Sequence, residues 1–170
     1  MTGQQAGNEI QALRRFLQDQ RDHVLGILDG LPEQSLRRAV MPSGWNCLGL
    51  LNHLAVEDER FWFRGVIAGE QEVIDEVAEG AGNGWNLGSA VPAEEVFALY
   101  RREIKIADVI VANSDPDAPP AWWPEELFPN WRLHSAREIV LHMIAETATH
   151  AGHLDTVREL IDGKQWSVQA

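Results

Sequence analysis

Apolar residues recur every three or four positions along most of this chain, which is the spacing of the buried face of an amphipathic helix. The first segment with this spacing ends at residues 29–32, where a glycine and a proline supply a stop signal. A second segment runs from about Cys47 to Ala68, and Gly69 closes it. We therefore expect a long helix in each segment, with one or two helical turns between them at 33–39.

Two further segments show the same spacing and carry clear end signals. A third helix is expected over 92–114, because a proline followed by two glutamates favours the first turn of a helix. A fourth is expected over 135–162. Ser135 and Glu138 form a capping-box pattern at its start, and Gly163 suits the position that follows a helix.

The connections between these helices differ in composition. Residues 42–46 predict a turn in which Ser43 or Asn46 caps the second helix. Residues 70–84 are acidic and then glycine-rich, which predicts a loop. Residues 115–133 are rich in proline and tryptophan and predict a long irregular connection before the last helix.

Four long helices without a strand pattern predict an all-α fold, a four-helix bundle. The chain has 170 residues, which suits one domain over residues 1–170 rather than two. A chain of this length buries enough surface to fold without disulfides or a structural metal. The expected architecture is therefore a single helical domain.

Acidic residues outnumber basic ones by 26 to 14, which gives a formal net charge of −12 at pH 7. This charge repels phosphate backbones and anionic lipid surfaces, so neither nucleic acid nor a membrane is an expected partner. The one cysteine, Cys47, excludes an internal disulfide framework and fits a reducing compartment. Because the first residues show neither a basic start nor an apolar run, we expect a cytoplasmic location.

The fourth predicted helix carries polar residues where a packed seam is expected. Alternating steps of four and three select Ile139, Met143, Glu146, His150, His153, Val157 and Leu160. Both ends of this seam are apolar and its middle is not. An unpaired buried carboxylate costs several kcal/mol or changes its protonation, so hydrogen bonds or a metal ion must compensate for it.

Glu146 and His150 lie one turn apart and can converge on a divalent cation. On the second helix, His53 stands on the apolar face and offers a third ligand, with Glu57 one turn further along. The set His53, Glu146 and His150 leaves coordination positions open, as catalytic metal sites do. The alternative is an ordinary hydrogen-bonded core. His153 has three possible roles: it binds the metal directly, it contacts a residue that does so, or it contacts the substrate.

Two parts of the chain resemble the DinB-like metalloprotein superfamily. Residues 51–57 (LNHLAVE), followed by 60–63 (RFWF), resemble its second helix, and residues 140–153 (VLHMIAETATHAGH) resemble its last helix. The resemblance covers roughly residues 9–163. It is strongest to an actinobacterial branch related to the N-terminal domain of mycothiol-dependent maleylpyruvate isomerase. That isomerase carries a further domain for which 170 residues leave no room, so its own reaction is not expected.

The resemblance implies a bundle in up-down-down-up order that holds one divalent metal ion, zinc or nickel. His53 and His150 match the first and last ligands of the family, and Glu146 takes the middle position, as in the isomerase branch. The metal binds a low-molecular-weight thiol of the mycothiol type, and the thiolate attacks an electrophile. Glu57 or His153 then accepts the proton that the thiol releases. The resemblance also implies a possible homodimer, although no segment of the sequence identifies an interface.

A metal-dependent thiol transferase that acts on electrophilic or toxic small molecules is therefore the expected function. Arg132 or Arg137 is a candidate for holding an anionic group of the thiol. The tryptophan-rich connection either walls a pocket above the metal or only covers the bundle. Two other classes stay open: a non-catalytic metal- or ligand-binding stress-response protein, and a helical dimerisation protein with a hydrogen-bonded polar core.

Overall fold

The described chain is helical, and its long helices begin and end near the predicted positions. The computed structural model describes residues 3–80 and 84–166, with side chains from residue 7 onward. Within these ranges there are six α-helices, one π-helix and no strand: α1 (Gly3–Leu28), α2 (Glu33–Leu36), α3 (Cys47–His53), the π-helix η1 (Leu54–Ile67), α4 (Gln71–Ala78), α5 (Ala93–Asn113) and α6 (Ala136–Asp162). The all-α prediction is confirmed for these residues. None of the helices described is both long enough and apolar enough to cross a lipid bilayer.

Caps that the sequence predicted set the ends of two helices. The side chain of Asn46, rather than that of Ser43, accepts a hydrogen bond of 2.9 Å from an N–H in the first turn of α3. The hydroxyl of Ser135 accepts a hydrogen bond from the N–H of Glu138 at the start of α6. Gly163 ends α6 with a φ of 77°, a left-handed conformation that favours glycine.

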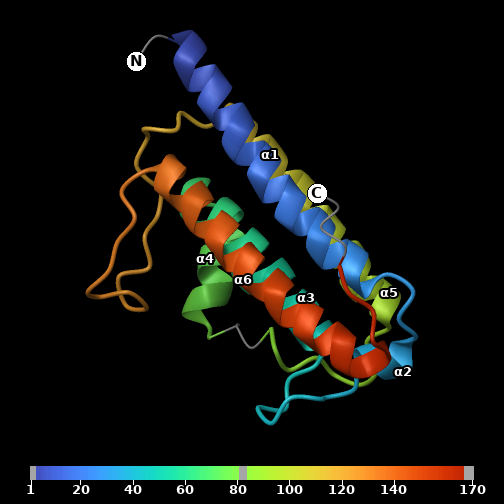
Figure 1. Cartoon of the computed structure of the whole chain (residues 1–170). Coiled ribbons are helices and arrows are strands. Elements are labelled where there is room, and N and C mark those ends of the chain that lie inside the picture. The colour runs from blue at the N-terminus through green and yellow to red at the C-terminus, as the bar shows by residue number, and fades with distance from the viewer. Residues whose placement is uncertain (1–2, 81–83, 167–170) are drawn as a thin grey trace.

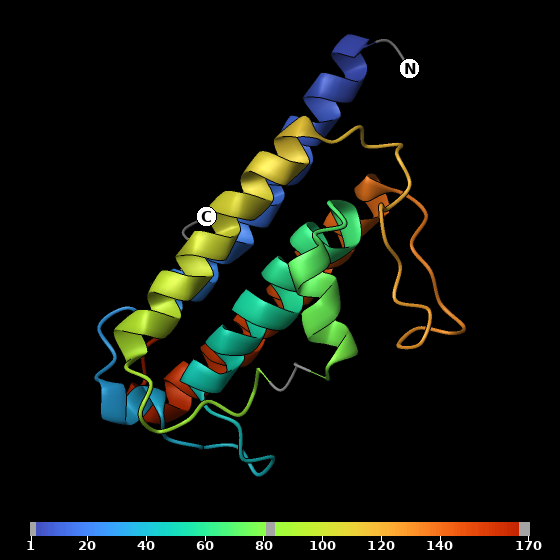
Figure 2. The same ribbon diagram turned by 180° about the vertical axis from the view of Figure 1, so that it is seen from behind.

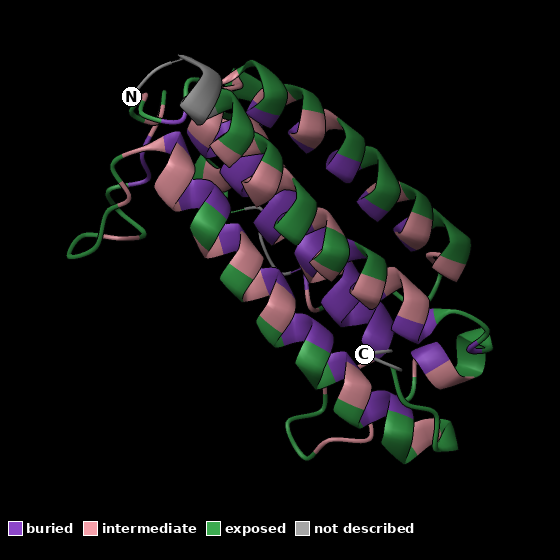
Figure 3. Cartoon of the chain, turned by 45° about the horizontal axis from the view of Figure 1, so that its top comes forward, coloured by how far each residue is buried: buried purple, intermediate pink, exposed green. Residues whose placement is uncertain are grey.

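The four long helical segments lie side by side as two neighbouring pairs. α1 packs along α6, and α5 packs along η1 (Figures 1 and 2). Buried residues line the sides of the helices that face one another (Figure 3). One cluster of buried apolar residues includes Leu48, Tyr100 and Leu154, and a second includes Phe63 and Met143. Both clusters contain residues from α6 and from the α3–η1 segment, so a shared core holds these two elements in place.

The expectation of a loop over 70–79 is wrong, because residues 71–78 form α4. Val73 is buried and packs closely on Gly65 of η1, where an added Cβ would lie 3.1 Å from the Cγ1 of Val73. Arg64 pairs with Glu70 at 2.7 Å just before α4. These tertiary contacts stabilise a short helix that has no side-chain cap of its own. Residues 81–83, in the glycine-rich part of the predicted loop, lie outside the described residues.

Four of the seven predicted seam positions of α6 are buried (Ile139, Met143, His150 and Val157), and three are not. The side chains on this face that are buried are Ile139, Met143, Thr147, His150, Leu154 and Val157. By contrast, the Glu146 side chain is 41% exposed, and His153 and Leu160 are exposed. The expectation that Glu146 is buried is therefore wrong. A straight helix has 3.6 residues per turn, so its buried face drifts against a strict alternation of steps of four and three. After Met143 the next buried residue is therefore Thr147, four positions on, rather than Glu146, three positions on.

The connection between α5 and α6 is irregular, as predicted, and is anchored to the end of η1. The N–H of Trp122 donates to the carbonyl of Val66 at 3.2 Å, and the N–H of Ala121 donates to the carbonyl of Ile67 at 3.4 Å. Carbonyls at the end of a helix lack partners within the helix, and the connection supplies them. This anchoring holds the aromatic residues of the connection beside η1.

Candidate metal and substrate site

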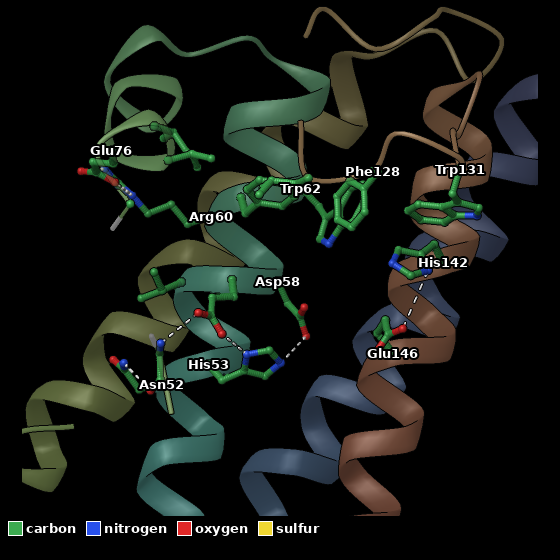
Figure 4. Close-up of a pocket in the computed structure, with 18 residues that line it drawn as sticks. Asn52, His53, Asp58, Arg60, Trp62, Glu76, Phe128, Trp131, His142 and Glu146 are labelled. Atoms are coloured by element: carbon green, nitrogen blue, oxygen red, sulfur yellow. Dashed lines mark hydrogen bonds and ion pairs between the residues drawn. The ribbon is translucent and has the colours of Figure 1, made fainter. Parts of the chain in front are cut away.

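His53 lies at the junction of α3 and η1, with both ring nitrogens directed at carboxylates (Figure 4). Its Nδ1 is hydrogen-bonded to Oε2 of Glu57, and its Nε2 lies 4.0 Å from Oδ2 of Asp58. The other oxygen of Glu57 accepts a hydrogen bond of 3.0 Å from the N–H of Gly84. Glu57 therefore orients the imidazole and leaves Nε2 available to bind a metal ion. Carboxylates play the same role behind metal-binding histidines in other proteins.

The π-helix explains why Asp58 shares a face with His53. In an α-helix, the residue five positions further on lies about 140° around the axis. In η1 the backbone hydrogen bonds span five residues, as in the bond of 3.0 Å from the N–H of Ala68 to the carbonyl of Phe63. The wider turn brings the fifth residue much closer to the same face than an α-helix does. Under α-helical periodicity Asp58 falls off the face that carries His53, so it was not among the predicted ligands; the acidic run at 57–59 was the available signal.

Asp58 is a buried carboxylate with one oxygen unpartnered. The residue is 5% exposed, and its Oδ2 has no hydrogen-bond partner among the described residues. Burial raises the pKa of Asp58 from 3.8 to about 7, an effect that the charge on His53 opposes and the charge on Glu146 reinforces. A buried carboxylate of this kind is unfavourable unless a proton or a cation neutralises it.

His150 of α6 faces His53, with their ring centroids 5.0 Å apart in an edge-to-face arrangement. Burial lowers the pKa of His150 to about 4, and repulsion from His53 and His153 adds to the effect. The ring is therefore neutral near pH 7 and has a lone pair to offer. Burial also acts to lower the pKa of His53, but the hydrogen bond to Glu57 and the neighbouring carboxylates outweigh it and leave that pKa raised.

His53, Asp58 and His150 together form a candidate metal site. One potential ligand atom from each residue lies within 4.8 Å of those of the other two. Two imidazole nitrogens and a carboxylate oxygen suit a divalent ion such as zinc or nickel. The unpartnered Oδ2 of Asp58 supplies negative charge where a cation would need it. The residues present therefore fit a divalent cation.

Glu146, which was predicted as the carboxylate ligand, lies next to this triad. Its Oε2 is 3.9 Å from Nε2 of His150, and its Oε1 is 4.0 Å from Nδ1 of His142. Its charge acts on both His53 and Asp58. The structure thus brings the two predicted histidines together and places a second carboxylate, Asp58, within 4.8 Å of a ligand atom of each.

His153 borders the site from the exposed side of α6. Its Nδ1 lies 3.5 Å from Nδ1 of His150, and its ring lies 6.3 Å from that of Trp45. His153 is therefore in contact with solvent and with one histidine of the triad at once.

The two arginines proposed to hold the thiol lie elsewhere. Arg132 pairs with Glu125, and Arg137 pairs with Glu9 and Asp117. Neither arginine is among the described residues that line the cavity beside the triad. The structure therefore does not bring them to the candidate site, because each guanidinium group is held by carboxylates outside it.

The segment that contains Gly84 and Trp85 closes over His53. The ring of Trp85 stacks on that of His53 with 4.5 Å between centroids. The side-chain amide of Asn52 donates a hydrogen bond of 2.9 Å to the carbonyl of Gly84. A Cβ on Gly84 would lie only 2.7 Å from the Cα of His53, so the close approach requires glycine. This segment covers one side of the triad.

A cavity of about 710 Å³ lies beside the triad. His53, Asp58 and Glu146 line one part of it, and Trp62 and Trp131 line another (Figure 4). The volume lies in the range of cavities that bind small molecules.

An all-helical chain whose imidazole and carboxylate groups converge beside a cavity fits the class that the sequence predicted, the DinB-like helical proteins. A family model described as mycothiol-S-transferase matches residues 12–163. The chain belongs to this family, and the predicted relationship to the DinB-like superfamily is confirmed. A search of curated proteins and a search of solved structures each found no match.

Proposed function

We propose that this protein is a metal-dependent thiol S-transferase, which uses a low-molecular-weight thiol of the mycothiol type against an electrophilic small molecule. The family match over residues 12–163 supports the thiol and the transfer reaction. The convergence of His53, Asp58 and His150 supports the metal. The observation that carries the proposal is the buried carboxylate of Asp58, whose Oδ2 has no hydrogen-bond partner among the described residues and which lies within 4.8 Å of ligand atoms of two histidines.

The proposed ligands are His53, His150 and one carboxylate. The structural evidence favours Asp58 for the third position, and the family resemblance favours Glu146. A divalent cation, zinc or nickel, lowers the pKa of a coordinating thiol from about 8.5 far enough to make it a thiolate at neutral pH.

The surrounding residues position the reactants and handle the proton. Glu57 keeps both oxygens engaged, with His53 and Gly84, and so serves as a positioning residue. His153, exposed beside His150, is the residue proposed to accept the proton of the thiol. The sulfur forms a new bond to the carbon of the electrophile as the leaving group departs with its bonding electrons.

The proposal includes a four-helix bundle in up-down-down-up order. In Figures 1 and 2, α1 and α6 run toward the end of the molecule that carries α2, whereas η1 and α5 run away from it, which supports that order. A single domain, a homodimer and a cytoplasmic location stay predictions.

Elemental analysis of protein purified without a histidine tag tests the metal site. We expect about one zinc or nickel ion per chain, lost in His150→Ala and kept in the matched control His134→Ala, because His134 is exposed and outside the cavity. Comparing Asp58→Asn with Glu146→Gln assigns the carboxylate. Undiminished metal in His150→Ala would remove that residue as a ligand.

Turnover with a panel of electrophiles, with and without the thiol, tests the transferase reaction. The second candidate function is a non-catalytic metal- or ligand-binding protein. The observation in its favour is that the one cysteine, Cys47, is 1% exposed and burial raises its pKa to about 11, so the chain supplies no reactive thiol of its own. Retained metal without turnover across the panel would support this second function.

A further inference from the structure

The part of the cavity away from the triad has aromatic walls contributed by two elements. The ring of Trp62 in η1 stacks on that of Phe128 at 5.7 Å with an interplanar angle of 19°. Trp131 meets Trp62 edge-on at 5.9 Å and Phe128 at 5.3 Å. Phe128 and Trp131 belong to the connection before α6, and Figure 4 shows all three rings on one side of His53 and Asp58. Trp131 is 41% exposed, so part of this aromatic surface is open to a ligand.

Without a bound metal ion, the charge of the cavity disfavours anionic ligands. Four carboxylates line it: Glu57, Asp58, Glu76 and Glu146. Arg60 is the one arginine or lysine among the described lining residues, and it is held by Glu76 through hydrogen bonds of 3.0 and 2.7 Å. No unpaired cationic side chain in this described lining is therefore available to an anionic ligand, and the carboxylates repel one.

We propose that the aromatic walls formed by Trp62, Phe128 and Trp131 bind the electrophile, and that they select an uncharged compound with a flat apolar group over an anionic one. Flat rings stack on aromatic walls, which contributes affinity beyond the apolar area buried. The cavity connects these walls to the triad, so a bound ring places an attached reactive carbon toward the thiol site. The role as electrophile subsite rests on the proposed transferase function, whereas the binding preference does not.

Two fluorescent probes that differ by one sulfonate test this preference without any reaction. N-phenyl-1-naphthylamine is uncharged, and 1-anilinonaphthalene-8-sulfonate carries the same rings with a negative charge. Titrated into the full-length protein in the presence of a chelator, the uncharged probe should bind at least about tenfold more tightly, since a sulfonate near several carboxylates loses roughly that factor. Equal or tighter binding of the sulfonate would overturn the charge selection.

Variants locate the bound probe. Trp131→Ala should weaken binding of the uncharged probe about fivefold, the loss expected for one aromatic contact. Trp166→Ala is the matched control, because Trp166 is a similarly exposed tryptophan that stacks on His23 and does not line the cavity. Leu127→Ala, a change at a 55% exposed lining residue, gives a second readout should Trp131→Ala disturb folding. Wild-type affinity in both cavity variants would refute the site.

A third variant tests the electrostatic reason. Glu76→Gln releases Arg60 from its closest partner, so it should strengthen binding of the sulfonate probe about threefold and leave the uncharged probe unchanged. Unaltered sulfonate binding would contradict the role of these charges. Failure of the transferase proposal is read separately, from metal content and thiol-dependent turnover, so the two outcomes are distinguishable.

Discussion

Replacing Asp58 with asparagine tests the charge at the centre of the proposed metal site. The substitution nearly preserves the size of the side chain and removes its charge. In the metal-free protein it removes a buried carboxylate whose Oδ2 lacks a partner among the described residues. In the metal-bound protein it removes a proposed ligand. We therefore expect opposite effects on the two forms, a gain of stability without metal and a loss of the stability that metal adds.

The size of the first effect follows from the pKa of Asp58, which burial raises from 3.8 to about 7. Each pKa unit corresponds to about 1.4 kcal/mol, so the buried charge costs the metal-free fold about 4 kcal/mol above pH 7. Because the pKa is raised in the folded state, the cost is absent below pH 3.8 and grows as the pH rises toward 7. An amide keeps part of the burial cost, so the expected stabilisation is about 1–3 kcal/mol at pH 8 and less at pH 5.

Urea unfolding in the presence of a chelator measures this effect at the two pH values. Thermal unfolding with added zinc measures the second effect, because a ligand that binds only the folded state raises its Tm. The wild-type Tm should rise with zinc, and that of Asp58→Asn should rise far less.

Glu146→Gln is the matched control, since it removes a neighbouring charge from a 41% exposed side chain. It should change the stability of the metal-free protein little. The reasoning is refuted if Asp58→Asn destabilises the metal-free protein at pH 8, or if it keeps the full rise in Tm with zinc.

Three further predictions address the elements around the site. Gly84→Ala places a Cβ 2.7 Å from the Cα of His53 and should weaken zinc binding about tenfold in a competition titration, whereas wild-type affinity would show that the approach is unimportant. In the wild-type protein the buried carboxylate of Glu59 lies 2.6 Å from the guanidinium of Arg21. Arg21→Met leaves this carboxylate without its partner and should lower the free energy of unfolding in urea by about 3–5 kcal/mol. Adding Glu59→Leu should restore most of that stability, and no recovery would contradict this account. Cys47, with a pKa raised to about 11 by burial, should react with iodoacetamide at pH 8 at least about a hundredfold more slowly in the folded protein than in urea, and similar rates would contradict its burial.

The positions of the long helices were predictable because their signals are local. The hydroxyl of Ser135 and the left-handed Gly163 act within one turn of the helix they delimit. α4 was not predicted, because its stability comes from Val73 packing on Gly65, six residues before the helix begins, rather than from a cap.

The candidate site was predictable in part. The polar positions His53 and His150 pointed to the right pair of helices, and the structure brings their rings within 5.0 Å of each other. Their role as metal ligands, like that of Glu146, stays a prediction. The buried carboxylate that needs compensation is Asp58, whereas the predicted one, Glu146, is partly exposed.

By itself, the sequence determined where the long helices lie and which two histidines carry the candidate chemistry, because periodicity and capping depend on neighbours in the chain. Only the tertiary structure decided which carboxylate meets those histidines. The apolar spacing along residues 54–67 does not distinguish a π-helix from an α-helix. The hydrogen bonds of η1 across five residues turn Asp58 toward His53, and the packing of η1 against α5 and α6 buries that carboxylate.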